Sequence, residues 1–197
     1  MPNQEAKTEN RSVRNTKKRL KDSLMALLKS KPASDITVKE LCDLADINRG
    51  TFYYHYTDIF DMLRKLQEEF TGEFYGIISP VKTAATPEEE AYSILAEVFV
   101  FFDENAEFSE ILLGPNGDMA FFQRLKKLVD EKCSDIWKEA GFLLSPAEYE
   151  LFNSFIINGF IGLLGTWLNT GRRQSPQEIA RFVTKNIIPV MKLTGEG

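Results

Sequence analysis

The feature that most restricts the fold is a series of helix-start signals crowded into a short stretch of the N-terminal third. Thr37 is followed three residues later by Glu40, which is the spacing of an N-terminal capping box. Asn48 is the next residue of a type that caps helices, and Thr57 or Asp58 caps another. Each helix between these signals has room for only about two turns. We therefore expect two short helices joined by a tight turn and flanked by longer ones, which is a helix-turn-helix unit. The first of the two short helices is expected to carry Leu41, Leu44 and Ala45 inward.

Apolar residues recur at helical spacing along the rest of the chain, and no stretch alternates as a strand does. A first helix from Val13 ends at Lys31, because the residue before Pro32 is pushed away from the α region. We expect an all-α fold with a small N-terminal domain at 1–58 and a larger domain at 59–197, joined by the helix that starts near residue 59. After a linker, five more helices are predicted, at about 88–104, 107–113, 118–140, 146–170 and 176–192.

The net charge of −5 is unevenly distributed along the chain. Residues 1–56 contain 11 Lys and Arg against 7 Asp and Glu, a net charge of +4, and the remainder carries a net charge of −9. A basic end on an acidic body indicates that only the first part meets a polyanion such as nucleic acid. Charge alone leaves open the alternative that these basic residues form an ordinary solvated surface.

Composition excludes several other classes of function. Two cysteines, Cys42 and Cys133, are too few for a disulfide framework, and with one histidine, His55, they are too few for a metal site. The Gly114–Asp118 turn lacks the Lys and Ser or Thr of a phosphate-binding loop, and its last residue is expected to cap a helix. No nucleophile and base can be paired around His55, so we expect no enzyme activity, metal or cofactor. Residues 1–15 lack the apolar core of a secretion signal, so we expect a cytoplasmic protein.

The stretch between Glu150 and Arg172 has no charged residue and is long enough to span a membrane. Its polar side chains and four glycines argue against a span. We expect instead a helix buried on two sides, with one side facing its own domain and the other facing a second copy of the chain. The alternative is the central helix of a monomer core. The residues expected at the dimer contact are Phe160, Ile161, Leu164, Trp167 and Leu168.

The second short helix has the residues of a DNA-reading helix. An α-helix fits the major groove of B-DNA, where base edges present a readable pattern of donors and acceptors. Asn48 suits adenine, Arg49 suits guanine, and Gly50 permits a close approach of the backbone. The hydroxyls and the ring nitrogen near the end of this helix suit phosphate oxygens, and they belong to Tyr53, Tyr54 and His55.

The segment Ile36–Tyr56 resembles the DNA-binding domain of the TetR family of bacterial transcriptional regulators. The likeness covers about residues 12–63 and is most specific at Gly50–Tyr56. It implies a homodimeric repressor that binds a palindromic double-stranded DNA operator and releases it when a small molecule fills a cavity in the larger domain. It also implies DNA contacts at the positions Thr37, Lys39, Asn48, Arg49, Gly50, Thr51, Tyr53 and His55.

Two residues depart from the family pattern. Asp46 replaces the usual glycine of the turn, and we expect the turn to survive because Asp tolerates the left-handed region. Ile59 replaces a lysine that often contacts phosphate, so one such contact is missing. The turn at Leu112–Asp118 is similar to one subgroup, which includes regulators of dihydroxyacetone kinase genes. These features leave open an alternative, a TetR-fold co-regulator that acts mainly through a partner protein and binds DNA weakly or not at all by itself.

Aromatic side chains of the larger domain are candidates for lining the ligand cavity, although aromatics at helical spacing more often form core. Few polar anchors accompany them, so a largely apolar, uncharged effector is favoured. The candidate ligand-binding residues are Tyr92, Phe99, Phe102, Phe121, Phe122, Trp137, Phe155 and Asn158.

Overall fold

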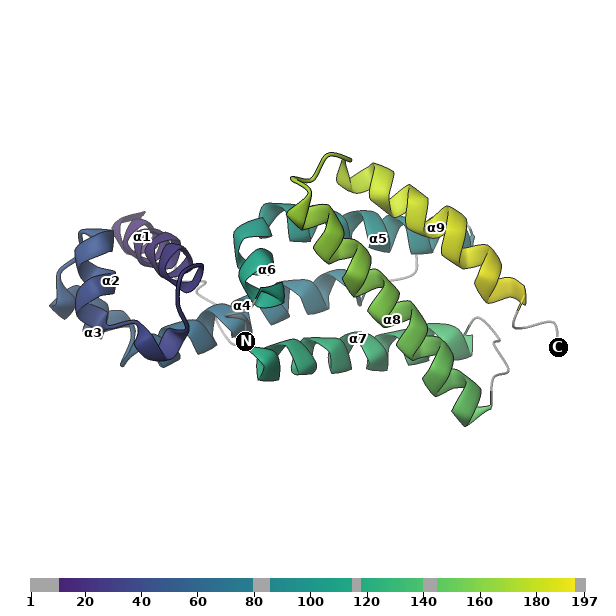
Figure 1. Ribbon diagram of the computed structural model, residues 1–197, viewed down its shortest axis with the longest axis horizontal. Helices are drawn as coiled ribbons and strands as arrows, with labels where there is room; N and C mark the ends of the chain where they lie inside the picture. The colour runs from purple at the N-terminus through teal and green to yellow at the C-terminus, as the bar shows by residue number, and fades with distance from the viewer. Residues whose placement is uncertain (1–10, 80–85, 115–117, 140–144, 194–197) are drawn as a thin grey trace, which may run out of the picture. The chain divides into compact units, whose positions relative to one another are not determined.

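The computed structural model describes residues 11–79, 86–114, 118–139 and 145–193, with the side chains of 87–88, 133–139 and 187–193 excepted. Every regular element in these ranges is helical, which confirms the expected all-α class (Figure 1). The short helices of the first part are α2 (Val38–Ala45) and α3 (Arg49–His55), as predicted. The elements are α1 (Arg11–Leu28), η1 (Ala33–Asp35), α2 (Val38–Ala45), α3 (Arg49–His55), α4 (Ile59–Ile77), α5 (Pro87–Glu104), α6 (Ala106–Leu113), α7 (Met119–Glu139), α8 (Pro146–Asn169) and α9 (Pro176–Leu193).

Tertiary contacts divide the chain into two compact units, residues 1–66 and residues 67–197. The division falls inside α4, whereas the functional boundary that we expect precedes this helix. The buried side chains of Ile59 and Met62 therefore belong to the same unit as α1, α2 and α3.

The smaller unit is built on a compact apolar core. One face of α1 buries Leu20 and Leu24, and α3 buries Phe52 completely. The expectation that Leu44 packs inward is wrong, because 54% of this residue is exposed. The buried face of α2 includes Cys42 instead. Each residue advances about 100° around a helix, so position 44, two residues later, lies on nearly the opposite side from Cys42.

Side-chain caps set the starts of α2 and α4. The Thr37 hydroxyl accepts the Glu40 N–H at 3.2 Å, so the first half of the expected capping box is present. The second half is replaced, because both Glu40 carboxylate oxygens bind the Lys31 ammonium, at 2.6 and 2.8 Å. Of the two candidate caps of α4, it is Asp58 that accepts the N–H of the third helical residue, Asp61, at 2.7 Å.

The turn between α2 and α3 depends on Asp46. Its φ of 51° and ψ of 51° lie in the left-handed region, which confirms that Asp takes the place of the usual glycine. The Arg19 guanidinium donates to the Asp46 carbonyl at 3.0 Å and to its carboxylate at 2.8 Å. Helix α1 therefore holds the turn that sets the angle between α2 and α3.

The larger unit has an aromatic core. Phe70 of α4 lies against Phe101 and Phe108, with ring centroids 4.6 and 4.9 Å apart. A second cluster joins Phe99 of α5 edge-to-face with Trp167 of α8 at 5.5 Å, and the indole N–H donates to the Gln174 carbonyl at 2.9 Å. Helix α9 packs along α5 (Figure 1). Burial of these rings contributes to the apolar core that stabilises the unit.

Side-chain caps also begin helices of the larger unit. The Asp118 carboxylate accepts the Phe121 N–H at 3.0 Å, which confirms the expected cap of α7. Ser145 and Glu148 form a complete capping box at α8, and a Ser-x-x-Glu pair starting at Ser175 does the same at α9.

Helix α8 is the one helix in the described part of the chain that is long and apolar enough to cross a membrane, judged by length and composition alone. Only 28% of its most apolar window is buried. The buried side chains include Leu164, Trp167 and Leu168, which we expected at a dimer contact. Their own chain already covers these three side chains and leaves little surface for a second copy, and the expected dimer contact stays a prediction. Phe160 and Ile161 are half-buried.

Candidate nucleic-acid interface

Helix α3 has one buried anchor and an exposed outer face. Phe52 is fully buried, and its ring meets the Tyr53 ring edge-on and the Tyr56 ring at a tilt, with centroids 5.5 and 5.6 Å away. Arg49, Tyr53 and Tyr54 are exposed, the last of them at 81%. The anchor fixes the helix in the unit while its outward side chains remain accessible to a macromolecular partner.

Asn48 begins α3, and this role limits what else it does. Its side-chain oxygen accepts the Gly50 N–H at 2.7 Å. A bidentate contact with adenine uses that oxygen and the amide nitrogen together, so in this conformation the oxygen's second lone pair would have to accept from the base while the first holds the cap. A Cβ on Gly50 would lie 3.2 Å from the Asn48 side-chain oxygen, so the glycine also makes room for the cap.

The remaining DNA-contact candidates lie on the same unit. Thr37 and Lys39 are exposed at the start of α2, while Thr51 and His55 are half-buried on α3. The Thr37 oxygen is used as an acceptor by the cap, which leaves its O–H as a donor. The His55 ring meets the Tyr54 ring edge-on at 4.9 Å. None of the nine candidates is buried, so all of them stay consistent with a contact surface.

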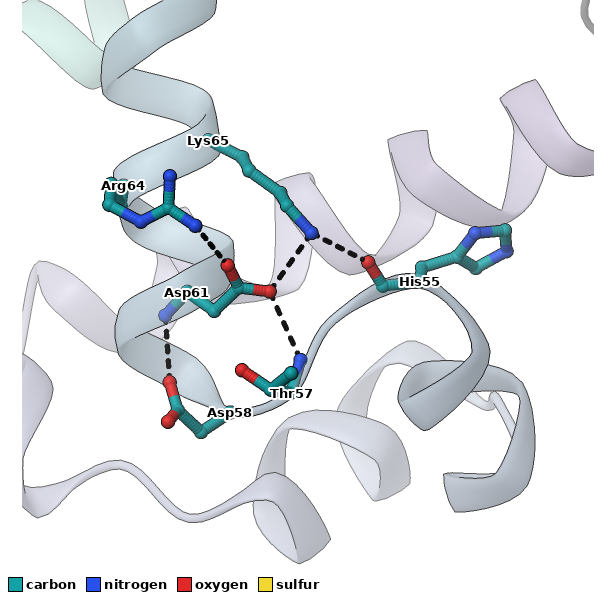
Figure 2. A network of polar contacts seen from close by, with 6 residues as sticks. All are labelled: His55, Thr57, Asp58, Asp61, Arg64 and Lys65. Atoms are coloured by element: carbon teal, nitrogen blue, oxygen red, sulfur yellow. Dashed lines mark hydrogen bonds and ion pairs between the residues drawn. The ribbon is translucent and has the colours of Figure 1, made fainter.

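Ile59 offers no phosphate contact in this chain. Its side chain is buried at the start of α4, so this position faces the core rather than solvent. An important residue that sequence reasoning missed lies further along α4. Lys65 donates to the carbonyl of His55, the last residue of α3 (Figure 2). Its one sequence signal was the spacing of four residues from Asp61.

The candidate ligand residues divide into four groups by burial. Phe99, Phe102 and Phe121 are buried among other aromatics, while Tyr92 and Phe122 are half-buried. Trp137 lies in the part of α7 whose side chains are outside the described set.

Phe155 and Asn158 do not face the interior of their unit. Phe155 is 70% exposed, and Asn158 is exposed and bonded to Lys126 at 3.2 Å. In the single chain the helical repeat turns them away from the buried Asn153 and Ile157, and their assignment to a ligand cavity stays a prediction.

The buried polar residues of the larger unit are ones the sequence did not indicate. Gln67 donates to the Asp118 carboxylate at 2.9 Å and accepts from Arg124 at 3.3 Å. Asn153 donates to the Asp130 carboxylate, which joins α8 to α7. Both amides lie in stretches dominated by apolar or charged neighbours, so only the packing identifies them as buried.

The described residues contain no group of three or more His, Cys, Asp or Glu that could hold a metal ion. Burial raises the pKa of the Cys42 thiol above its ordinary value, which disfavours the reactive thiolate. The side chain of Cys133 lies outside the described residues.

Among curated proteins, the chain is similar to an uncharacterized HTH-type transcriptional regulator, YxbF of Bacillus subtilis (strain 168). The identity is 22% over 174 residues, which cover 83% of this chain and 42% of that protein. The chain therefore spans less than half the length of this relative.

Two solved structures share the fold. The dihydroxyacetone kinase operon activator DhaS superposes with a TM-score of 0.60 at 16% identity, over 92% of this chain and 98% of that one. FadR from Bacillus subtilis, solved in complex with stearoyl-CoA, superposes with a TM-score of 0.63 at 16% identity, over 91% of this chain and 98% of that one.

A family profile identifies the chain directly. Residues 89–188, half of the sequence, match the TetR profile described as "Transcriptional regulator C-terminal region". The match lies in the larger unit, and the helix-turn-helix supplies the N-terminal half of the same architecture. This is the arrangement of soluble regulators and not of enzymes. The chain belongs to the TetR family of transcriptional regulators.

Proposed function

We propose that this regulator is a cytoplasmic, homodimeric repressor that binds a palindromic DNA operator and leaves it when a small molecule binds the larger unit. The observation that carries the proposal is that α3 is anchored on one side and exposed on the other. Its buried Phe52 fixes the helix, while Arg49 and the two following tyrosines stay exposed. A short, firmly anchored helix with an exposed arginine near its start is suited to reading base edges in the major groove.

The dimer is proposed to form through the outer face of α8. Leu151, Phe155, Gly159 and Gly162 are exposed on this face, and nothing in the described chain lies within 4 Å of a Cβ built on either glycine. Phe182 of α9 adds a further exposed aromatic side chain. A soluble protein gains by covering such apolar surface, and glycines let a second helix approach closely. In the dimer, the two recognition helices meet major grooves about 34–36 Å apart.

The effector is proposed to be a largely apolar small molecule. The larger unit is aromatic at its core. FadR, which shares its fold, was solved with stearoyl-CoA, a molecule that has a long apolar acyl chain on a charged coenzyme A. Release of DNA requires that the effector binds more tightly to a state whose recognition helices no longer match the operator. The half-buried Tyr92 and Phe122 are better placed to meet a ligand than the fully buried phenylalanines, which already pack against one another.

A second candidate function is a co-regulator that acts mainly through a partner protein. The buried Ile59 favours it, because this position supplies no phosphate contact. The similarity to DhaS, an operon activator, also leaves the sign of regulation open. Such a protein has weak or no DNA affinity of its own.

The test is quantitative binding of the purified protein to the DNA upstream of its own gene, across salt concentrations. Arg49→Ala is expected to weaken specific binding roughly tenfold to a hundredfold and to relax sequence preference, because a lost bidentate base contact is worth roughly 1–3 kcal/mol. Lys39→Ala is expected to weaken all sequences alike and to lower the salt slope by about one.

Arg173→Ala is the matched control, since it removes the same charge from an exposed position in the larger unit. Binding that is weak and sequence-blind in the wild type, or that Arg49→Ala and Arg173→Ala change equally, contradicts direct operator reading and favours the co-regulator.

A further inference from the structure

The end of α3 and the start of α4 are joined by a polar network centred on Asp61 (Figure 2). The Asp61 carboxylate accepts the Thr57 N–H at 3.0 Å, the Lys65 ammonium at 2.9 Å and the Arg64 guanidinium. Two of these donors are one helical turn along α4, and the third is in the linker between the helices. The carboxylate therefore fastens the linker to the first turn of α4.

Lys65 extends this network to the recognition helix. Its ammonium also donates to the carbonyl of His55 at 3.0 Å and lies 5.3 Å from the centre of the Tyr56 ring. The last carbonyls of a helix have no partner within the helix. A cation at that end satisfies one of them and is attracted by the negative end of the helix dipole. One ammonium thus bridges the C-terminus of α3 and a carboxylate on α4.

This arrangement differs from an ordinary surface ion pair. The Asp61 side chain is only 11% exposed, and its hydrogen bonds with Lys65 and Thr57 lower the pKa of the carboxyl to about 2. An exposed pair four residues apart within one helix contributes only a few tenths of a kcal/mol. Here Lys65 also donates to the His55 carbonyl, so the loss of the pair disturbs a contact between α4 and the end of α3 and not merely one within α4.

We propose that Asp61 and Lys65 are positioning residues that hold the recognition helix at the orientation needed to bind DNA. The inference rests on the proposed function, since it assumes that α3 enters the groove. The competing explanation is that Lys65 contacts a phosphate itself and that Asp61 merely competes for its ammonium.

The two explanations predict opposite signs for Asp61→Asn. This substitution removes a negative charge, so electrostatics alone, or a freed Lys65 contacting phosphate, tightens DNA binding. If the network positions α3, the variant binds its specific site about tenfold more weakly, because the charge-assisted bonds to Lys65 and Arg64 are lost. Asparagine keeps the shape and an acceptor for the Thr57 N–H, which limits the disturbance to the charged part of the network.

Asp22→Asn is the matched control. Asp22 pairs with Lys18 at 2.7 Å, four residues apart within α1, and both side chains are largely exposed. The control removes the same charge from the same unit and breaks the same kind of ion pair without touching α3. It is expected to leave specific binding unchanged or slightly tighter.

Two substitutions at Lys65 complete the set. Lys65→Met removes the ammonium and is expected to weaken specific binding about tenfold, as Asp61→Asn does. Lys65→Arg restores a donor and is expected to bind within about threefold of the wild type. Because the two groups act as one bridge, the double variant Asp61→Asn with Lys65→Met is expected to lose no more DNA affinity than the single variant that binds more weakly.

The experiment measures two properties of each full-length variant. The first is affinity for the sequence that the wild type selects from a random double-stranded pool, with the active fraction set by stoichiometric titration. The second, made without DNA, is hydrogen exchange at the last turn of α3, where the Tyr56 N–H bonds to the Phe52 carbonyl at 2.9 Å. Faster exchange in Asp61→Asn and Lys65→Met than in Asp22→Asn, together with weaker specific binding, supports the proposal.

Tighter binding by Asp61→Asn overturns the proposal, and so does unchanged exchange in α3. If the wild type selects no sequence at all, the proposed function fails instead, and the exchange measurement still decides whether the bridge holds α3. The two failures are therefore distinguishable.

Discussion

Phe155→Arg is expected to dissociate the proposed dimer while leaving each subunit folded. Phe155 is 70% exposed on α8 of the single chain, whereas Leu164 and Trp167 on the opposite face are buried. An arginine at position 155 removes apolar surface from the proposed contact and places two like charges across its symmetry axis. The subunit core is untouched, because the residue makes little contact with it.

The size of the effect follows from the exposed fraction. A fully buried aromatic side chain covers roughly 150–250 Å², so 70% exposure leaves roughly 100–170 Å² for a partner to cover. At about 25 cal/mol per Å² this area corresponds to roughly 2.5–4 kcal/mol per copy, and symmetry doubles it. Partial burial at a real contact reduces the total, so we expect a loss of at least about 4 kcal/mol, or about a thousandfold in the dimer dissociation constant.

Sedimentation equilibrium over a range of protein concentrations measures this constant. Phe60→Arg is the matched control, because Phe60 is also an exposed phenylalanine but lies on α4 in the smaller unit. The reasoning is refuted if Phe155→Arg remains a dimer of wild-type affinity, or if Phe60→Arg weakens association as much. Far-UV circular dichroism checks that both variants are folded.

Two further predictions concern stability. Trp167→Ala is expected to lower the free energy of unfolding by roughly 3–5 kcal/mol, measured by urea denaturation at a protein concentration that keeps the dimer intact, because the indole is buried against Phe99. A loss below 1 kcal/mol would show that the ring is not core. The pKa of Asp61 is lowered from 3.8 to about 2, so its stabilising contribution is present above about pH 4 and is lost as pH falls toward 2. The stability difference between wild type and Asp61→Asn should therefore shrink over that interval, and a constant difference would contradict the role of the charged carboxylate.

Local sequence signals predicted the helices and most of their starts. The caps at Thr37, Asn48 and Asp118 depend on atoms three or fewer residues apart, and helical geometry alone brings such atoms together. The left-handed Asp46 was likewise predictable, since few residue types tolerate that conformation. For the same reason the nine candidate DNA contacts could be placed on α2 and α3 before any coordinates were known.

Rotations of helices about their own axes were not predictable. Helix α8 is apolar almost all round, so its sequence does not distinguish the face that meets its own unit from the face left exposed. This ambiguity explains why the sequence did not indicate that Phe155 is exposed and that Leu164 and Trp167 are buried within their own chain. The expected burial of Leu44 was wrong for a related reason. A helix of eight residues has too few apolar positions to define its buried face.

The amino-acid sequence by itself determined the all-α class, the helix-turn-helix and its place in the chain, because these depend on spacing along the backbone. Only the tertiary structure decided that Glu40 binds Lys31 and that Lys65 reaches the end of α3. It also decided which face of α8 stays exposed. Each of these outcomes depends on how one element packs against another, and a charged or apolar side chain has many possible partners until that packing selects one.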